Sequence, residues 1–209
     1  VLDNESRRVL LLNSVAARSE SVQSIMGKAL KLYTDTGKQT LEDIYDNSSG
    51  LWYDVNFSSL KWINGEDVLV CTTIDVTQKI RNQQKIEYQA NNDYLTGLFN
   101  RMKCERDLDE ILKNMNPGEK GCVVFLDLDN FKQVNDGLGH QYGDVLLQEI
   151  AYSLQETDCI KNSCYRMGGD EFVIIVKPWY FDKITEIVDK ISKRFNDIWH
   201  IMDVDYYCT

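Results

Sequence analysis

Acidic side chains lie at two places in the second half of the chain where extended segments are expected to end. Asp127 follows the apolar run 122–126, and Asp170 and Glu171 follow a pair of glycines. A carboxylate at the end of a buried strand costs desolvation free energy unless it meets a cation or hydrogen-bond donors. If the two segments meet, three carboxylates come together, and their like charge favours bound Mg²⁺ or Mn²⁺. Metals held in this way activate an attacking hydroxyl and stabilise a transferring phosphoryl group.

The neighbours of these acids suit a phosphate-bearing ligand. Gly168 and Gly169 lack side chains and would let a ligand approach the backbone closely. Lys132 lies in the turn expected after Asp127 and would offset phosphate charge. A plainer interpretation makes the Gly-Gly-Asp-Glu segment a solvated turn and Asp129 a helix cap, but it explains Asp127 less well.

The segments that must position these residues alternate between helical and extended patterns. Helices are predicted over 99–114, 142–156 and 180–199, and strands over 121–127, 163–167, 172–177 and 205–209. The run 122–126 is apolar at every position, which predicts a central strand buried on both faces. The order of elements predicts a mixed α/β sheet with helices packed on it.

The first part of the chain predicts a separate antiparallel unit. Val9–Asn13 suggests a strand, 14–32 one or two helices, and 40–76 a meander with a tight turn at Asn64-Gly65. Thr77 is a suitable N-cap for a polar helix over 78–92. That helix is either a solvated connection or a short coiled coil, and the heptad pattern is too brief to separate the two.

Length and composition limit the classes of function. The chain has 209 residues, which is one large domain or two small ones. Its net charge of -10 argues against binding nucleic acid or an anionic membrane. Six cysteines without a C-x-x-C pair, and two histidines, argue against a zinc site and favour a reducing, cytoplasmic setting. No apolar run approaches 18 residues, so we expect no membrane contact in this segment.

Four ordered motifs resemble those of the GGDEF family of diguanylate cyclases. They are Asp93–Arg101, Phe125–Asp136, Gly139–Asp144 and Arg166–Phe172. The resemblance implies an α+β class and a palm-like (ferredoxin-like, nucleotidyl-cyclase-like) α/β domain over 93–209. It also implies an enzyme that condenses two GTP into cyclic di-GMP and releases pyrophosphate.

The resemblance assigns roles residue by residue. Metal would be bound by Asp127, the Leu128 carbonyl, Asp170 and Glu171. One of the last two acids would assist deprotonation of the 3′-hydroxyl, and which one is left open. Lys132 would contact the phosphates, and an amide and a carboxylate would read the guanine edge. The substrate-binding residues implied are Asn135, Asp144, Gly168, Gly169, Phe131 and His140, the last two as packing or pocket-wall residues.

The resemblance further implies that two such domains face each other, so that a homodimer is required for catalysis. The family's inhibitory R-x-x-D motif corresponds to residues 159–162, which lack the Arg and the Asp, so we expect no product feedback there. The family's domain continues with a further strand, helices and a lysine-containing segment. We therefore expect the domain to be truncated at its C-terminus, which leaves the activity of this piece open.

Residues 1–77 resemble a PAS domain more loosely, through the Val9–Asn13 strand and the 40–76 meander. No histidine occurs in residues 1–92, and the flavin-adduct cysteine motif is missing, so neither haem nor flavin is expected. The organisation predicted is a PAS-like sensory or dimerisation domain (1–77), a linker helix (78–92) and a GGDEF domain (93–209), with the first domain controlling the cyclase. Two alternatives remain. One is a catalytically silent GTP-binding regulatory domain, with fusion to a downstream phosphodiesterase as one arrangement, and the other is a sensory and interaction module.

Overall fold

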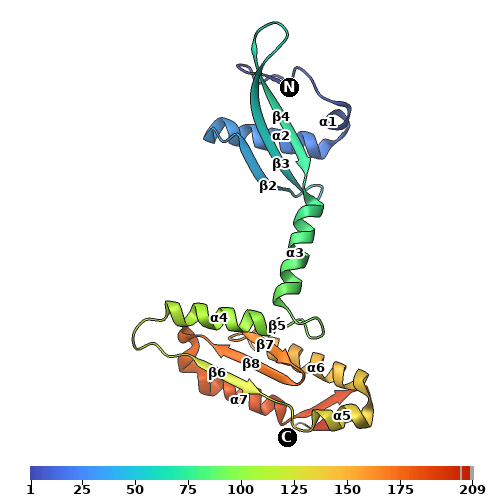
Figure 1. The fold of residues 1–209 in the computed structure, drawn as a ribbon, viewed down its shortest axis with the longest axis vertical. Helices are drawn as coiled ribbons and strands as arrows, with labels where there is room; N and C mark the ends of the chain where they lie inside the picture. The colour runs from blue at the N-terminus through green and yellow to red at the C-terminus, as the bar shows by residue number, and fades with distance from the viewer. Residues whose placement is uncertain (203, 208–209) are drawn as a thin grey trace. The chain divides into compact units, whose positions relative to one another are not determined.

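The computed structural model describes residues 1–202 and 204–207. The chain divides into two compact units, Val1–Lys85 and Ile86–Thr209 (Figure 1). Helix α3 (Thr77–Asn91) begins in the first unit and ends in the second. None of the described helices is both long enough and apolar enough to cross a membrane.

The first unit is an antiparallel sheet with helices on one face (Figure 1). Its strands lie in the order β1-β4-β3-β2. The elements are β1 (Leu2–Asp3), α1 (Ser14–Arg18), α2 (Glu20–Thr36), β2 (Thr40–Asp46), β3 (Leu51–Lys61) and β4 (Asp67–Asp75). Alternate residues of β3 point to the same face, so Tyr53, Val55 and Phe57 are buried together against Ile25 and Ala29 of α2. The predicted helices and antiparallel meander are therefore present.

Two local predictions in this unit are wrong. Val9–Asn13 is not a strand, because Val9 makes only an isolated bridge to Leu2 and the amides of Leu10 and Leu11 both donate to the Val1 carbonyl. Thr77 begins α3, but its hydroxyl accepts a 2.8 Å hydrogen bond from the Trp52 amide. A contact between distant residues therefore takes the oxygen that was expected to cap the helix.

The second unit is a mixed α+β domain whose sheet has the order β5-β7-β8-β6. Strands β7 and β8 form a hairpin, and β9 and β10 form a separate two-stranded sheet. The elements are β5 (Phe99–Asn100), α4 (Arg101–Asn114), β6 (Cys122–Leu126), α5 (Phe131–Leu138), α6 (His140–Gln155), β7 (Cys164–Gly168), β8 (Glu171–Val176), the 3₁₀ helix η1 (Pro178–Lys183), α7 (Ile184–Phe195), β9 (Ile198–Ile201) and β10 (Val204–Tyr207). This arrangement confirms the predicted fold class.

Helices pack on both faces of this sheet (Figure 1). Phe172, Ile174 and Val176 of β8 pack with α6 and α7 on one face, whereas Val173 and Ile175 pack with α4 on the other. Strand β8 is thus buried on both faces, as parallel or central strands are.

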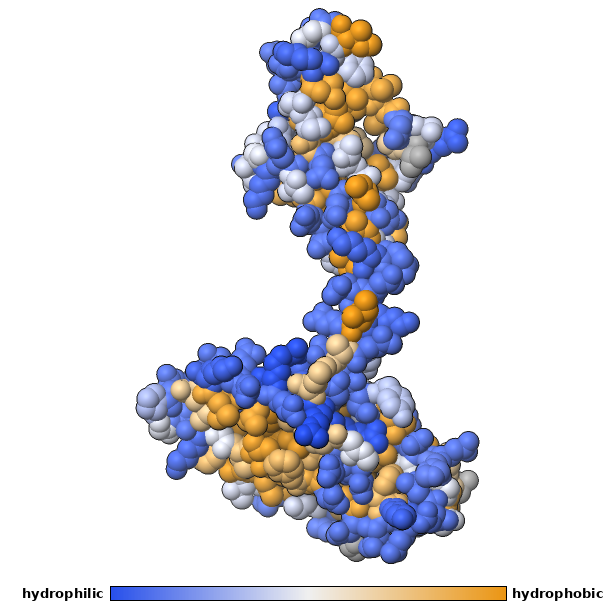
Figure 2. Space-filling view, in the orientation of Figure 1, coloured by the Kyte–Doolittle hydropathy of each residue, from blue (hydrophilic) through white to orange (hydrophobic). Residues whose placement is uncertain are grey.

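Strand β6 was predicted to be the central, buried strand, and the structure contradicts this. Within the described residues β6 lies at the edge of its sheet, and Phe125 is 75% exposed on the face that α4 covers elsewhere. Figure 2 shows an apolar area beside the polar outer surface of α4. An apolar run therefore did not reveal which strand has neighbours on both sides.

Two predicted boundaries change for identifiable reasons. Helix α4 begins at Arg101 because Phe99 and Asn100 pair with β7 and the Asn100 side chain accepts from the Lys103 amide. The helix predicted over 180–199 ends at Phe195, after which alternation buries Trp199 and Ile201 in β9. The expected strand 205–209 is seen as β10, and residues 208–209 lie outside the described residues. Helix α5 had no predicted bounds, although Asp129 was considered as the cap of a following helix; it begins at Phe131, directly after Asn130.

Candidate functional site

The turn between β7 and β8 carries the Gly-Gly-Asp-Glu segment and is a tight hairpin. Gly168 pairs with Glu171, and Gly168 and Gly169 have φ angles of 140° and 54°. Side chains with a Cβ rarely adopt these backbone conformations, so glycine is required for this turn. The conformation fixes where Asp170 and Glu171 leave the sheet.

Strand pairing brings Asp127 to Glu171. Leu126 of β6 pairs with Phe172 of β8, so Asp127 and Glu171 are the next residues along the two antiparallel strands. Both line a cavity of about 390 Å³, together with Arg101, Phe125, Leu126 and Met167. The Asp127 and Glu171 side chains are exposed, and within the described part of the chain they make no hydrogen bond or ion pair. Their oxygens are therefore available to a ligand.

The predicted cluster of three carboxylates is reduced to a pair around this cavity. Asp170 is half-buried and does not line the cavity, and the described residues hold no group of three acidic, histidine or cysteine side chains placed for a metal. Asp170 lies in the turn, and β8 begins at its neighbour Glu171, so only Glu171 is fixed by strand pairing against β6. Two carboxylates still fit Mg²⁺, which is commonly held by one or two carboxylates together with substrate phosphates.

Arg101, the last residue of the motif Asp93–Arg101, also lines this cavity, and no role was predicted for it. Its guanidinium is 2.8 Å from Glu105, one helical turn along α4. Its place beside Asp127 and Glu171 puts a positive charge at the same cavity. The available signal was its place as the last residue of the motif Asp93–Arg101.

The other predicted substrate residues lie around the start of α5 and of α6. Lys132 is in the first turn of α5 and is exposed, and His140 is exposed at the first residue of α6. Leu128 is buried, and its carbonyl accepts from the Phe131 amide at 3.2 Å. Phe131 is half-buried against the core of the unit, as expected for a packing residue.

Asn135 and Asp144 come from different helices that meet at Gly143. A Cβ added to Gly143 would collide with Oδ1 of Asn135 and lie 3.1 Å from Cζ of Phe131. Gly143 directly precedes the exposed Asp144. The absence of a side chain at Gly143 therefore lets the Asn135 amide approach the helix that carries Asp144.

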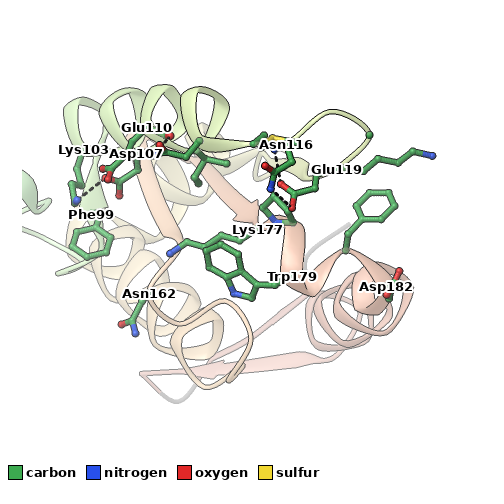
Figure 3. Close-up of a pocket in the computed structure, with 17 residues that line it drawn as sticks. Phe99, Lys103, Asp107, Glu110, Asn116, Glu119, Asn162, Lys177, Trp179 and Asp182 are labelled. Atoms are coloured by element: carbon green, nitrogen blue, oxygen red, sulfur yellow. Dashed lines mark hydrogen bonds and ion pairs between the residues drawn. The ribbon is translucent and has the colours of Figure 1, made fainter.

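A second and larger cavity, of about 970 Å³, contains none of the predicted catalytic or substrate-binding residues (Figure 3). It lies between α4 and η1 and is lined by Trp179, Lys177, Lys103 and Asp107, among others. Lys103 is 2.6 Å from Asp107, and the Lys177 ammonium lies over the Trp179 ring. Because its charged groups are mixed in sign, the cavity indicates no particular class of ligand.

Known proteins resemble this chain mainly over its second unit. The family model described as "Diguanylate cyclase, GGDEF domain" matches residues 90–209. The probable diguanylate cyclase DgcE of Escherichia coli is 33% identical over 174 residues, which are 79% of this chain and 16% of that protein. The cyclic di-GMP phosphodiesterase PdeR of the same organism is 33% identical over 144 residues, which are 68% of this chain and 21% of that protein. The chain thus spans about a fifth or less of the length of these relatives.

A solved structure comprising only the GGDEF domain of TpbB (YfiN) from Pseudomonas aeruginosa has the same fold. It is 32% identical, with a TM-score of 0.50, and the match covers 56% of this chain and 70% of that chain. The family match begins at residue 90, so the PAS resemblance of residues 1–77 stays a prediction. Since the family model covers more than half of the chain and its motifs form one hairpin and one acidic cavity, the chain belongs to the GGDEF family of diguanylate cyclases.

Proposed function

We propose that the second unit condenses two molecules of GTP into cyclic di-GMP and releases two pyrophosphates. One observation carries the proposal: Asp127 and Glu171 line one cavity, and their carboxylates make no hydrogen bond or ion pair with the described residues. Exposed acids that converge without partners are suited to a cation and a phosphate-bearing ligand. The relatives named as diguanylate cyclases support the same reaction.

Asp127 and Glu171 would hold Mg²⁺ or Mn²⁺, with Asp170 adjacent in the chain. Bound there, the ion would neutralise phosphate charge and favour ionisation of the attacking 3′-hydroxyl. The Leu128 carbonyl accepts one hydrogen bond from Phe131 and keeps a second lone pair for the ion. Asp170 or Glu171 would accept the proton of the 3′-hydroxyl.

The remaining residues would bind and orient GTP. Asn135 and Asp144 offer an amide and a carboxylate, which match the acceptor and the N–H donors of the guanine edge. Lys132 would contact the phosphates, and the bare backbone of Gly168-Gly169 would let them approach. Phe131 and His140 would form the walls of the base pocket.

Catalysis would require a homodimer, because each domain binds one GTP and each GTP supplies the nucleophile for the other. Holding the two nucleotides in attack geometry would account for much of the rate. Residues 1–77, as a PAS-like domain, would control the geometry of the dimer through the helix over 78–92. The protein would act in the cytoplasm.

The test is incubation of the chain, and of the full-length protein that contains it, with GTP and Mg²⁺, followed by chromatography of the products. We expect cyclic di-GMP and pyrophosphate from the full-length protein, and loss of both in Asp170→Ala. Glu149→Gln removes an exposed acid on the outer surface of α6 and serves as the matched control. Absence of product from a folded, dimeric full-length protein would contradict the proposal.

A GTP-binding regulatory domain without turnover is the second candidate, because one relative that shares the matched segment is named as a phosphodiesterase. This candidate predicts Mg²⁺-dependent GTP binding by the folded chain without cyclic di-GMP formation. Equilibrium binding of GTP in the same samples separates it from the cyclase. A sensory and interaction module predicts neither binding nor product.

A further inference from the structure

Arg166 of β7 joins two separate segments of the second unit. Its Nε and Nη2 atoms donate to the Gly169 carbonyl at 3.0 and 2.7 Å, and its Nη1 atom donates to Oδ1 of Asp93 at 2.8 Å. The Arg166 and Asp93 side chains are only 10% and 16% exposed. A guanidinium that uses one edge on a carbonyl and another nitrogen on a carboxylate is held in a single orientation.

On one side, Arg166 fixes the turn that carries the candidate catalytic acids. Gly169 directly precedes Asp170, and both glycines of the turn have positive φ angles. Glycine gives the turn its shape but also gives it the most conformational freedom to lose. The two donors on the Gly169 carbonyl restrict that freedom at the residue before Asp170.

On the other side, Asp93 is anchored to the segment that follows α3. Its Oδ1 accepts from the amide and hydroxyl of Thr96 at 2.9 and 2.7 Å, and its own amide donates to the Leu98 carbonyl. Burial opposes ionisation of Asp93, but hydrogen bonds from Arg166 and Thr96 hold its pKa below the ordinary value. The carboxylate is thus charged at neutral pH and orients Arg166.

The elements that follow this segment, β5 and α4, are bonded to the end of α3. The Asn100 side chain donates to the Ala90 carbonyl at 2.9 Å, and Arg106 donates to Asn91 Oδ1 at 2.7 Å. Asp93 lies two residues after the end of α3 and bonds Arg166, which in turn bonds the signature turn, so these contacts connect the end of α3 with that turn.

We infer that Arg166 is a positioning residue of the candidate active site. Arg166 holds the turn before Asp170 in the geometry needed for turnover, and Asp93 fixes the orientation of Arg166. The inference rests on the proposed function. It also makes the Asp93–Arg166 pair the connection through which displacement of the α3 end would alter the acidic site.

The experiment compares Arg166→Lys, Arg166→Ala and Asp93→Asn with the wild type in the full-length protein. For each protein, kcat and KM for GTP, the melting temperature and amide hydrogen exchange are measured. Lysine keeps the charge but cannot span Gly169 and Asp93 together. We expect Arg166→Lys to lower kcat by about 10–100-fold with a smaller change in KM, as for residues that orient a ligand group. Exchange should accelerate at residues 169–171 and not across the rest of the unit.

Lys103→Met is the matched control, because it removes another short, half-buried ion pair of the same unit, away from the signature turn. If Arg166→Ala fails to fold, the inference is tested by Arg166→Lys and Asp93→Asn alone. Unchanged kcat in those two variants of an active protein would overturn the inference alone, as would faster exchange throughout the unit or an equal loss in the control. A wild-type protein that binds GTP but makes no product would contradict the proposed function and, with it, this role.

Discussion

Asp46 in the first unit and Glu171 in the second both lie beside a tight turn of an antiparallel sheet, but their carboxylates have different surroundings. Asp46 is fully buried and bonded to Lys28, Ser48 and Ser49, at 3.2, 2.6 and 2.8 Å. Glu171 is exposed on a cavity and has no side-chain hydrogen bond or ion pair within the described residues. A carboxylate whose bonds are already made stabilises the fold, whereas one without partners can bind a ligand.

The same contrast holds for the glycines of the two units. Gly27 lies in α2 with nothing within 4 Å of an added Cβ, whereas Gly143 of α6 has Asn135 and Phe131 in that space. The first glycine is replaceable and the second makes room for a predicted substrate residue. Substitutions and a change of pH at these four residues test whether the two units differ in this way.

The largest effect is expected from Glu171→Gln, which keeps the size of the side chain but removes its charge. We expect cyclic di-GMP formation to fall by at least about 10²-fold, the usual scale for a group that transfers protons or holds reacting charge. Steady-state rates with GTP at several Mg²⁺ concentrations measure this. Asp46→Asn in the first unit is the comparison, and an equal loss of chemistry in that variant with folding intact would contradict the assignment.

Gly143→Ala should destabilise the second unit by about 1–3 kcal/mol, because the new methyl group must displace Asn135 or Phe131. Urea denaturation followed by fluorescence gives the free energy of unfolding. Gly137→Ala in α5 is the control, since an added Cβ there meets nothing within 4 Å. GTP affinity should fall in Gly143→Ala, and unchanged stability and affinity would show that α5 and α6 adjust freely.

Acidification should destabilise the first unit through Asp46. Hydrogen bonds from Ser48, Ser49 and Lys28 hold the pKa of Asp46 far below its ordinary value. A lowered pKa in the folded state gives stability that is present above the unfolded pKa of about 3.9 and is lost as the pH falls below it. Melting temperatures between pH 7 and pH 3 should therefore drop more steeply in the wild type than in Asp46→Asn, and parallel curves would exclude this origin.

The smallest effect is a gain of about 0.5–1 kcal/mol from Gly27→Ala in α2, because alanine loses less backbone entropy than glycine in a helix. Thermal unfolding followed by circular dichroism is sufficient to detect it. Cyclic di-GMP formation should not change, since a Cβ added at Gly27 meets nothing within 4 Å. A loss of stability would reveal a contact that the open space around Gly27 does not suggest.

Local sequence determined most of the elements and the order in which they occur. Gly168-Gly169 predicted the β7–β8 turn because only glycine adopts its backbone conformations freely, and the tight turn at Asn64-Gly65 predicted the hairpin of β3 and β4. The order and spacing of the motifs pointed to the segments of Asp127 and Glu171. These features depend on residues close together in the chain.

Long-range packing determines which of the acids share a cavity and which residues fix the position of these acids. The register of β6 against β8 places Asp127 beside Glu171 and leaves Asp170 outside, and Arg166 reaches Asp93 across 73 positions of the sequence. Among the described strands, β6 lies at the edge of its sheet, although its sequence resembles that of a buried strand. The physical reason is that strand order and long-range pairing arise from packing of the whole unit, whereas periodicity reports only the faces of a single segment.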